Sequence, residues 1–436
     1  MVGRRLANLV TEHKKTVIST IFGLIAGPII GYLIIEYITI TPSDLVGSLE
    51  NGDVSNFNEE RKMVKQQIVF DGIDLSAKDL EGASLNSIVI LHSNLSNTNL
   101  QYSQLENAQI SGDLSGINLR FANLWDADLR GATLARADLT DAILSDADLT
   151  NAGLQAADLI DAFLQNADLI DANLVRADLT DAILSDADLT RADFGEADLT
   201  DASLIRADLT NANLEDAELS GAGLRDADLT NANLRIADLS GAILADADLT
   251  NANLQSAGLT DADLVRANLT DSMLRRADLS GANLLSADLT NAVLDGADLS
   301  DTSLIRADLT NADLDGADLS DAYIWDADLT NANLRIAHLS GAILAEADLT
   351  NASLARADLT RANLVGTDLM HADLKFADLT SALVLNSDLT DADLSVVNLN
   401  EAKFDCNSLK TANLTAVNVS RIYIVDSDGN EVSSCN

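Results

Sequence analysis

The sequence has few of the residues on which most enzyme and metal sites depend. Its 436 residues include two cysteines, two prolines and four histidines, and aromatic residues make up only 3%. No histidine has a cysteine or a second histidine at ligand spacing; the four are His13, His92, His338 and His371. No phosphate loop, dinucleotide fingerprint or Ser-His-Asp pattern is present. We therefore expect no enzymatic activity, no bound cofactor and no small-molecule substrate.

The two cysteines, Cys406 and Cys435, form no C-x-x-C motif, which argues against a zinc or thioredoxin-type site. In an oxidising compartment they predict a disulfide that ties the C-terminal tail to the preceding residues. Two separate free thiols are the alternative.

Basic residues are also scarce. The chain has 69 acidic and 27 basic residues, a formal net charge of -42, and only eight of its residues are lysine. Such a surface repels nucleic acid and anionic lipid and attracts cations or basic proteins. An acidic, lysine-poor surface also suits high salt, where ions screen the repulsion, so the charge by itself does not require a partner.

A long uncharged apolar run occurs at the N-terminus, from Val17 to Ile35, and apolar residues continue past Glu36 to Ile40. This is about the 20 residues that a membrane-spanning helix needs. Basic residues precede the run and acidic residues follow it, so the positive-inside rule predicts a cytoplasmic N-terminus. We predict a single-pass protein of the cell membrane, with a cytoplasmic basic segment at 1–16, a transmembrane helix at 17–40 and an extracytoplasmic remainder. A cleaved signal peptide is the alternative, but no A-x-A site follows the run.

Gly23, Gly27 and Gly31 repeat every four residues within this predicted helix. Small residues at this spacing let two membrane helices approach closely, which favours a homodimer. The alternative is that glycine is simply common in membrane helices.

Residues 41–70 are predicted to be a linker and an N-terminal cap. The stretch "NFNEERKMVKQQIVF", residues 56–70, predicts a short amphipathic helix with Phe57, Met63, Val64 and Ile68 toward one side. Every solenoid needs its open end covered, and this helix is placed to do so.

From 71 to 425 the sequence has a period of five. In "ADLTDAILSDADLTNAGLQA", residues 137–156, leucine returns every fifth residue and alanine stands two places before each leucine. A helix requires a period of 3.6 and a strand a period of 2, so neither explains the pattern. Units such as "ADLTD", "ANLVR" and "ADLSG" resemble the pentapeptide-repeat family, whose motif is A-(D/N)-L-x-x. The resemblance implies an all-β fold: a right-handed quadrilateral β-helix with four pentapeptides per 20-residue coil, in which leucine and alanine point inward.

The number of repeat centres predicts about 18 coils and a rod on the order of 85 Å long. The step from Ile110 to Leu114 is four residues, which predicts a register break at 110–114. Lys78 stands at a small inward position where a charge cannot stay buried, so the first coil is interpreted as part of the cap. Ser272 and Thr302 replace the inward alanine.

Residues 426–436 predict a closing hairpin and tail, turned at Asp428-Gly429. The spacing of Asp426, Asp428 and Asn430 also fits the start of a calcium loop. However, the glycine is misplaced for an EF-hand and the chain ends before the twelfth position. We favour the turn.

Because "ADLT" units recur every ten residues, their aspartates are expected to stack as ladders on two opposite faces. We predict these ladders as candidate interaction sites: Asp138, Asp158, Asp178 and Asp198 on one face, and Asp148, Asp168, Asp188 and Asp208 on the other. Their side chains can also bond the local backbone. The other two faces carry arginines within reach of acidic neighbours: Arg136, Arg176, Arg276 and Arg356 on one, and Arg206, Arg266 and Arg306 on the other. Trp125 and Trp325 are expected to point outward.

These features favour a non-enzymatic, membrane-anchored acidic rod that acts as an extracytoplasmic scaffold, spacer or protein-interaction surface, with an unknown protein partner and no direct contact with nucleic acid. The resemblance provides an alternative, because the family includes acidic rods that mimic B-form DNA and protect DNA gyrase from quinolones. A third hypothesis is that the Asp ladders bind divalent cations, Ca²⁺ or Mg²⁺.

Overall fold

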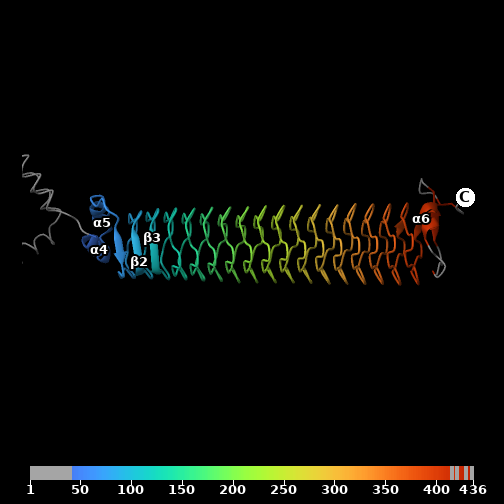
Figure 1. Cartoon of the computed structure of the whole chain (residues 1–436), viewed down its shortest axis with the longest axis horizontal. Helices are drawn as coiled ribbons and strands as arrows, with labels where there is room; N and C mark the ends of the chain where they lie inside the picture. Colours follow the sequence, from blue (N-terminus) through green and yellow to red (C-terminus); the bar gives the residue numbers. More distant parts are fainter. Residues whose placement is uncertain (1–41, 413–416, 418–421, 427–430, 433–436) are drawn as a thin grey trace, which may run out of the picture.

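The computed structural model of the chain is a long, narrow rod of stacked coils (Figure 1). It describes residues 42–412, 417, 422–426 and 431–432. The predicted cytoplasmic segment and transmembrane helix lie outside these residues. Among the residues that are described, no helix is long and apolar enough to cross a membrane.

The length of one coil follows from the parallel bridges between outward positions. Asp138 bridges to Asp158, and Asp158 bridges in turn to Asp178, so each coil is built from four pentapeptides. The Leu139 N–H donates to the Asp158 carbonyl at 2.7 Å, and the Asp158 N–H donates to the Ala137 carbonyl at 2.9 Å. These bonds connect consecutive coils along the axis of the rod. The mostly-β solenoid that the period of five predicts is confirmed.

Each coil turns at four corners, and the turns have one recurring geometry. At one corner the Ala142 N–H donates to the Leu139 carbonyl at 2.9 Å, and the third residue of the turn, Asp141, has a φ of 57°. A positive φ at the third residue alone is typical of a type II turn. Asp, Asn and Arg take this position at most corners, although glycine adopts it with less strain.

The interior of the rod is filled by the repeating leucine and alanine, which are buried from end to end. The residues that replace leucine or alanine in the repeat are buried as well: Phe194 and Ile324 at leucine positions, and Ser272 and Thr302 at alanine positions. The Thr302 hydroxyl donates to the Leu279 carbonyl at 3.1 Å, whereas the Ser272 hydroxyl has no hydrogen-bond partner.

The predicted register break is confirmed between strands β2 (Val89–Asn94) and β3 (Gln109–Asp113). Val89 pairs with Gln109, at the regular interval of the coil, but Ser93 pairs with Gly112, so the interval between partners is shorter by one residue. One residue is therefore missing from this coil relative to its neighbours. With β1 (Val69–Asp71), these strands form a parallel three-stranded sheet.

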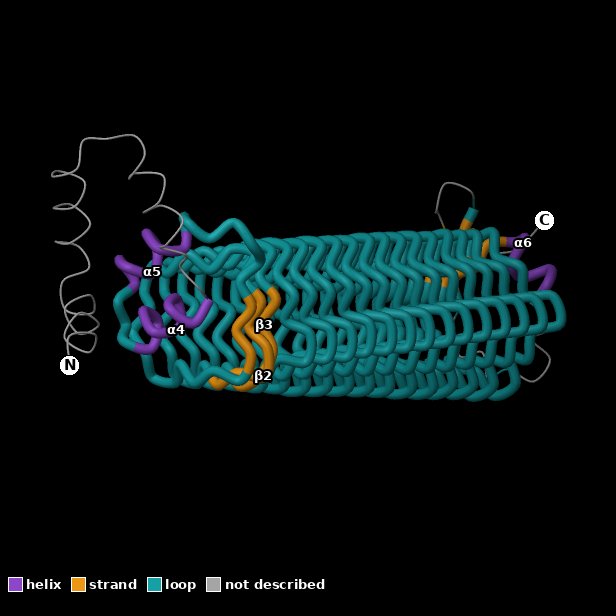
Figure 2. The backbone as a smooth tube through the Cα atoms, turned by 60° about the vertical axis from the view of Figure 1, so that its left-hand side comes forward, coloured by secondary structure: helices purple, strands orange, loops and turns teal. Residues whose placement is uncertain are grey.

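Two short helices, α4 (Pro42–Glu50) and α5 (Val54–Arg61), cover the N-terminal end of the rod (Figure 2). Phe57 and Ile68 are buried there, as predicted, and Val64 is partly buried. The sequence prediction was wrong in three respects. It missed α4, whose Leu45 and Leu49 are buried, it extended the second helix beyond Arg61, and it placed the exposed Met63 on the buried side.

The interpretation of the first coil as part of the cap was also wrong. Leu75 and Leu80 are fully buried, and Asp74 and Asp79 bridge to the next coil, so this is a regular coil of the β-helix. Lys78 is tolerated because its side chain is only half-buried at this end of the rod.

At the C-terminal end, β4 (Leu383–Val384), β5 (Lys403–Asp405) and β6 (Tyr423–Val425) pair in parallel. A helix, α6 (Cys406–Thr411), interrupts the repeat after β5, which leaves about 17 coils instead of the 18 predicted. The predicted hairpin is present as antiparallel pairing of β6 with β7 (Glu431–Val432), although its turn lies outside the described residues.

Candidate interaction surfaces

The aspartates of the "ADLT" units lie on two opposite sides of the rod. We call the first acidic face the ladder through Asp138, Asp158, Asp178 and Asp198, and the second acidic face the ladder through Asp148, Asp168, Asp188 and Asp208. Each member is bridged to the next, so successive carboxylates occupy equivalent positions on successive coils. The stacking expected from the period is therefore present.

The ladder aspartates also hold the backbone. The Asp178 Oδ1 accepts the Thr180 N–H at 3.0 Å and the Thr180 hydroxyl at 2.6 Å. The same bond to the residue two places on recurs at Asp188, 3.0 Å from the Thr190 nitrogen, and at Asp198, 2.9 Å from the Thr200 nitrogen. This Asx-type bond fixes the backbone before each corner, which explains the Asp or Asn of the motif without a ligand.

Charge accumulates along the ladders where such donors are fewer. The pKa of Asp168 is raised by partial burial and by the neighbouring carboxylates of Asp148 and Asp188. Burial and the charges of Asp238, Asp198 and Asp216 likewise raise the pKa of Glu218 on the first acidic face. Elsewhere the hydroxyl and N–H of Thr390 lower the pKa of Asp388. The ladders therefore contain carboxylates whose charged form is destabilised and others whose charged form is stabilised.

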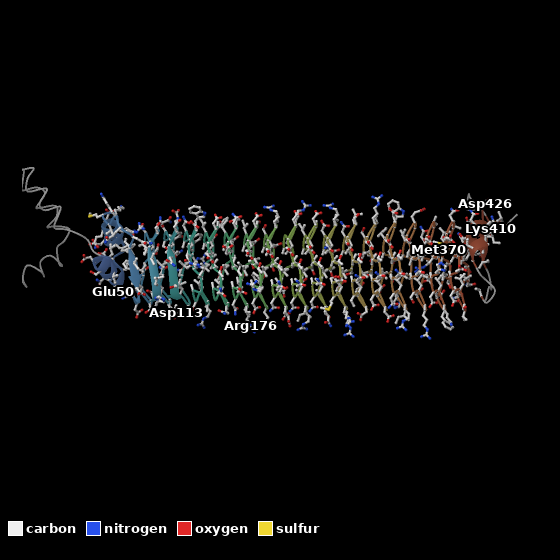
Figure 3. All side chains as sticks on the ribbon, in the orientation of Figure 1. Glu50, Asp113, Arg176, Met370, Lys410 and Asp426 are labelled. Carbon is white, nitrogen blue, oxygen red and sulfur yellow. The ribbon has the colours of Figure 1, made fainter. Side chains whose placement is uncertain are left out.

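All seven arginines predicted for the other two faces lie instead at corners, in the turn position with a positive φ. Four of them form ion pairs between neighbouring coils. The arginine–carboxylate distances are 2.8 Å for Arg176–Glu196, 2.6 Å for Arg206–Asp186, 2.5 Å for Arg266–Asp246 and 3.1 Å for Arg306–Asp326. All four arginines are more than half exposed, and such pairs contribute little stability individually. Figure 3 labels Arg176 among the side chains that project from the rod. Arg356 lies instead over the ring of Phe376, 5.8 Å from its centre.

One face between the acidic faces carries exposed apolar side chains that the sequence prediction did not group. A ladder of bridges runs through Ile143, Phe163 and Ile183 and reaches Ile243 farther along. On the same ladder Tyr323 bridges to Ile343, but the apolar residues are not continuous. The positions between them are Ser203, Gly223, Asp263, Asn283 and Ser303. Ile143, Phe163, Ile243 and Tyr323 are 39–48% exposed. We call this ladder, together with the flanking Trp125 and Trp325, the apolar face.

Trp125 and Trp325 point outward, as expected. The Trp125 indole nitrogen donates to an Asp146 carboxylate oxygen at 2.8 Å, and the Arg306 guanidinium lies over the Trp325 ring at 5.4 Å. The signal that could have found the apolar face is an apolar residue that recurs, at intervals of whole coils, in the position before the central residue of the repeat. The same interval reveals the acidic ladders.

Several predicted sites are not assembled by the described part of the chain. Gly23, Gly27, Gly31 and Cys435 lie outside it, so the helix pairing and the disulfide to Cys406 stay predictions. Among residues 42–412 and the shorter described segments, no group of three or more His, Cys, Asp or Glu side chains is arranged to hold a metal ion.

The known proteins that match this chain match its repeat region. The family model for pentapeptide repeats in eight copies matches overlapping segments that together run from 113 to 384. None of the curated proteins compared with the chain matches it. Among solved structures, the chain is 32% identical to the pentapeptide repeat protein HetL, involved in heterocyst differentiation regulation in the cyanobacterium Nostoc sp. strain PCC 7120. The match covers 63% of this chain and 89% of HetL, with a TM-score of 0.16.

Two shorter matches have similar identity. The chain is 35% identical to Rfr23 from the cyanobacterium Cyanothece 51142, over 22% of this chain and 61% of Rfr23, with a TM-score of 0.17. It is 31% identical to a pentapeptide repeat protein of the Arabidopsis thaliana thylakoid lumen, over 23% of this chain and 66% of that protein, also with a TM-score of 0.17. The family model covers more than half of the sequence, and the chain belongs to the pentapeptide-repeat family.

Proposed function

We propose that the chain is a non-enzymatic, membrane-anchored rod that presents an extended protein-interaction surface outside the cytoplasmic membrane. The observation that carries the proposal is the contrast between the faces. The two acidic faces repeat Asp and Thr, and these residues are largely engaged in holding the turns. The apolar face exposes Phe163, Ile243 and Tyr323, which the fold does not require outside. Exposed apolar side chains gathered on one face are typical of interaction sites.

The interaction surface is tested by site-specific photo-crosslinking in cells. A photoreactive amino acid placed at Phe163 lies on the apolar face, and one placed at Thr200 lies on the first acidic face at a similar distance along the rod. We expect a discrete cross-linked partner from position 163 that is absent from position 200. Equal cross-linking from both positions, or none from 163, argues against the proposal.

The anchor and its orientation are separate parts of the proposal and rest on the apolar run at 17–40 and its flanking charges. The test is protease digestion of intact spheroplasts that contain the full chain, with a cytoplasmic protein as control. Digestion of the rod from outside supports the orientation, whereas protection until lysis contradicts it. If Gly23, Gly27 and Gly31 pair two copies, Gly27→Leu should abolish cross-linked dimers and leave membrane insertion intact.

A second candidate function is mimicry of B-form DNA toward DNA gyrase or another DNA-binding protein, and the charge density favours it. Residues 113–405 contain 54 acidic and 17 basic residues, about 2.5 net negative charges per 20-residue coil. Duplex DNA carries about 2.8 phosphate charges over the same roughly 4.8 Å. Inhibition of gyrase supercoiling by the rod, lost at high salt, supports this function. Unchanged supercoiling at a large excess of rod removes it.

The third hypothesis is that the Asp ladders bind divalent cations. Burial raises the pKa of Asp168, and the charges of Asp148 and Asp188 raise it further; a bound ion would relieve this repulsion. Calorimetric titration with calcium tests this hypothesis. A smaller heat of binding in an Asp168→Asn variant would place the bound ion at the second acidic face. A flat titration removes the hypothesis.

A further inference from the structure

A pocket of about 400 Å³ lies between the end of α5 and the first coils, at the N-terminal end of the rod. The lining comes from the segment 61–68 on one side and from 86–88 on the other. It belongs neither to the apolar face nor to the acidic ladders, and the pentapeptide pattern does not require it.

The lining of this pocket has the opposite charge from the rest of the protein. Arg61 and Lys65 contribute to it and no aspartate or glutamate does, in a chain with 69 acidic and 27 basic residues. The acidic residues nearest in sequence are occupied elsewhere: Glu59 pairs with Lys62 at 3.0 Å, and Glu60 accepts the Ser48 hydroxyl at 3.0 Å. Within the described part of the chain, neither Arg61 nor Lys65 forms a salt bridge.

The Arg61 guanidinium is partly buried without a counter-charge. One terminal nitrogen donates to the Asn86 carbonyl, and the Nε is buried with no hydrogen-bond partner. This burial lowers the pKa of Arg61. A desolvated cation with unfilled donors is costly unless an anion compensates it, and a planar guanidinium matches the oxygens of a phosphate or carboxylate.

The remaining walls of the pocket combine polar and apolar side chains. Gln66 and Gln67 line the pocket with amide groups, while Val64, Ile68 and Ile88 give it an apolar side. Ile68 and Ile88 are buried. We infer that this pocket binds the phosphate group of a ligand with a small apolar portion, with Arg61 and Lys65 as the cationic donors.

Two sources could supply such a phosphate: the headgroup of an anionic membrane lipid or a soluble phosphate ester. The pocket lies at the end of the rod where the chain leaves toward the predicted membrane helix. A lipid headgroup is therefore the source expected if the proposed anchor is correct, but the chemistry of the pocket does not depend on the anchor.

The test uses the full chain reconstituted in phosphatidylcholine vesicles, titrated with inorganic phosphate and followed by ³¹P NMR and by thermal unfolding. We expect saturable binding that Lys65→Gln and Arg61→Gln each weaken about tenfold or more. Lys62→Gln is the matched control, because Lys62 pairs with Glu59 outside the pocket, and it should leave binding unchanged. Lys65 is exposed, so its variant should keep the circular dichroism spectrum of the rod.

Repeating the titration in phosphatidylglycerol vesicles separates the two sources. Binding of phosphate that weakens in these vesicles shows that the lipid occupies the pocket, and binding that is equal in both shows a soluble ligand; both results support the site. No saturable binding, or binding that Lys65→Gln and Lys62→Gln reduce equally, overturns it. Because these outcomes do not depend on which side of the membrane the rod lies, failure here leaves the proposed function standing.

Discussion

The backbone of Gly112 packs directly against Ser93. A Cβ atom added to Gly112 would lie less than 3.0 Å from both the amide nitrogen and the carbonyl oxygen of Ser93. Gly112 also has a φ of 125°, a conformation that other residues rarely adopt. This contact is the point where the coil loses one residue, so glycine is required here for both space and backbone conformation.

Gly112→Ala should therefore destabilise the rod by about 3 kcal/mol, through overpacking and backbone strain together. Gly131→Ala is the matched control. Gly131 also has a positive φ, 62°, but nothing lies within 4 Å of its added Cβ, so the cost should be about 1 kcal/mol. Urea unfolding followed by circular dichroism measures both. Equal costs would show that the contact with Ser93 relaxes easily.

Two of the inward hydroxyl groups, those of Ser272 and Thr302, should have opposite effects when removed. Ser272 is buried with an unpartnered hydroxyl, so Ser272→Ala should stabilise the protein by about 1 kcal/mol. Thr302→Ala removes a hydroxyl that donates to the Leu279 carbonyl, and it should cost about 1 kcal/mol. The measurement is the free energy of unfolding of each variant, and a loss of stability in Ser272→Ala would point to a partner for that hydroxyl.

Strain at the corners predicts a further stabilising change. Ile236 is a β-branched residue with a φ of 55°, a conformation that costs L-residues roughly 1–2 kcal/mol and that asparagine tolerates better. Ile236→Asn should raise stability by about 1 kcal/mol. Ile243→Asn is the control, since Ile243 is similarly exposed but lies on a bridge and not at the positive-φ position. A gain in both variants would indicate an effect of exposed apolar surface instead.

Acid should affect Asp168 and Asp388 in opposite directions. The bridges of the second acidic face continue along the rod as far as Asp388, so both residues belong to it. The pKa of Asp168 in the folded protein is raised, so its charge destabilises the fold at neutral pH, and this penalty is relieved as the pH falls through the folded pKa. Asp168→Asn should therefore stabilise the rod at pH 7 by about 0.8 kcal/mol, the repulsion between charges about 5 Å apart in water, and this gain should shrink toward pH 4 and in 1 M salt.

The pKa of Asp388 is lowered by the hydroxyl and N–H of Thr390. Its stabilising contribution is present above the unfolded pKa and is lost as the pH falls through the folded pKa. Asp388→Asn should therefore lower stability at pH 7 and have less effect in acid. Urea midpoints of both variants between pH 7 and pH 3 test the sign, and parallel curves would contradict the assignment.

The predicted bridge between Cys406 and Cys435 can be tested directly. Thiol titration of the unfolded protein, purified without reductant, should detect no free thiol if the bridge exists and two if it does not. Since the disulfide would tie the tail to α6, its reduction should loosen the C-terminal end and leave the central coils unaffected.

The sequence was most informative about the fold where each residue contributes to one repeating geometry. Alternating leucine and alanine at a period of five predicts the coil, and the four-residue step at Ile110–Leu114 predicts the break. It was least informative at the ends. Leu409 continues the period of five, so the sequence predicts another repeat where the structure has α6. The helix begins there because Asp405 accepts the Ser408 N–H at 2.9 Å as its N-cap. The pair Asp405 and Ser408 was the available signal.

Of the candidate surfaces, the sequence predicts those that repeat regularly and misses those that do not. The acidic ladders follow from a motif repeated every ten residues, but the apolar face depends on positions that vary from coil to coil. The sequence indicates that the ladder aspartates can bond the local backbone, and the distance from Asp178 to Thr180 shows that this bond is present at the turn. The pocket at Arg61 and Lys65 joins segments from two different parts of the chain and has no periodic signature.

The hydrogen bonds between coils also set how the rod responds to force. They run along the axis, as the bond from Leu139 to Asp158 shows, so tension applied to the two ends loads the coils in series. The weakest coil then opens first, and its roughly 20 residues extend to roughly 68 Å from an initial rise of about 4.8 Å. Compression instead presses the filled interior together and meets the resistance of a packed core. A rod held at both ends would thus keep a fixed minimum separation and yield in discrete steps when pulled.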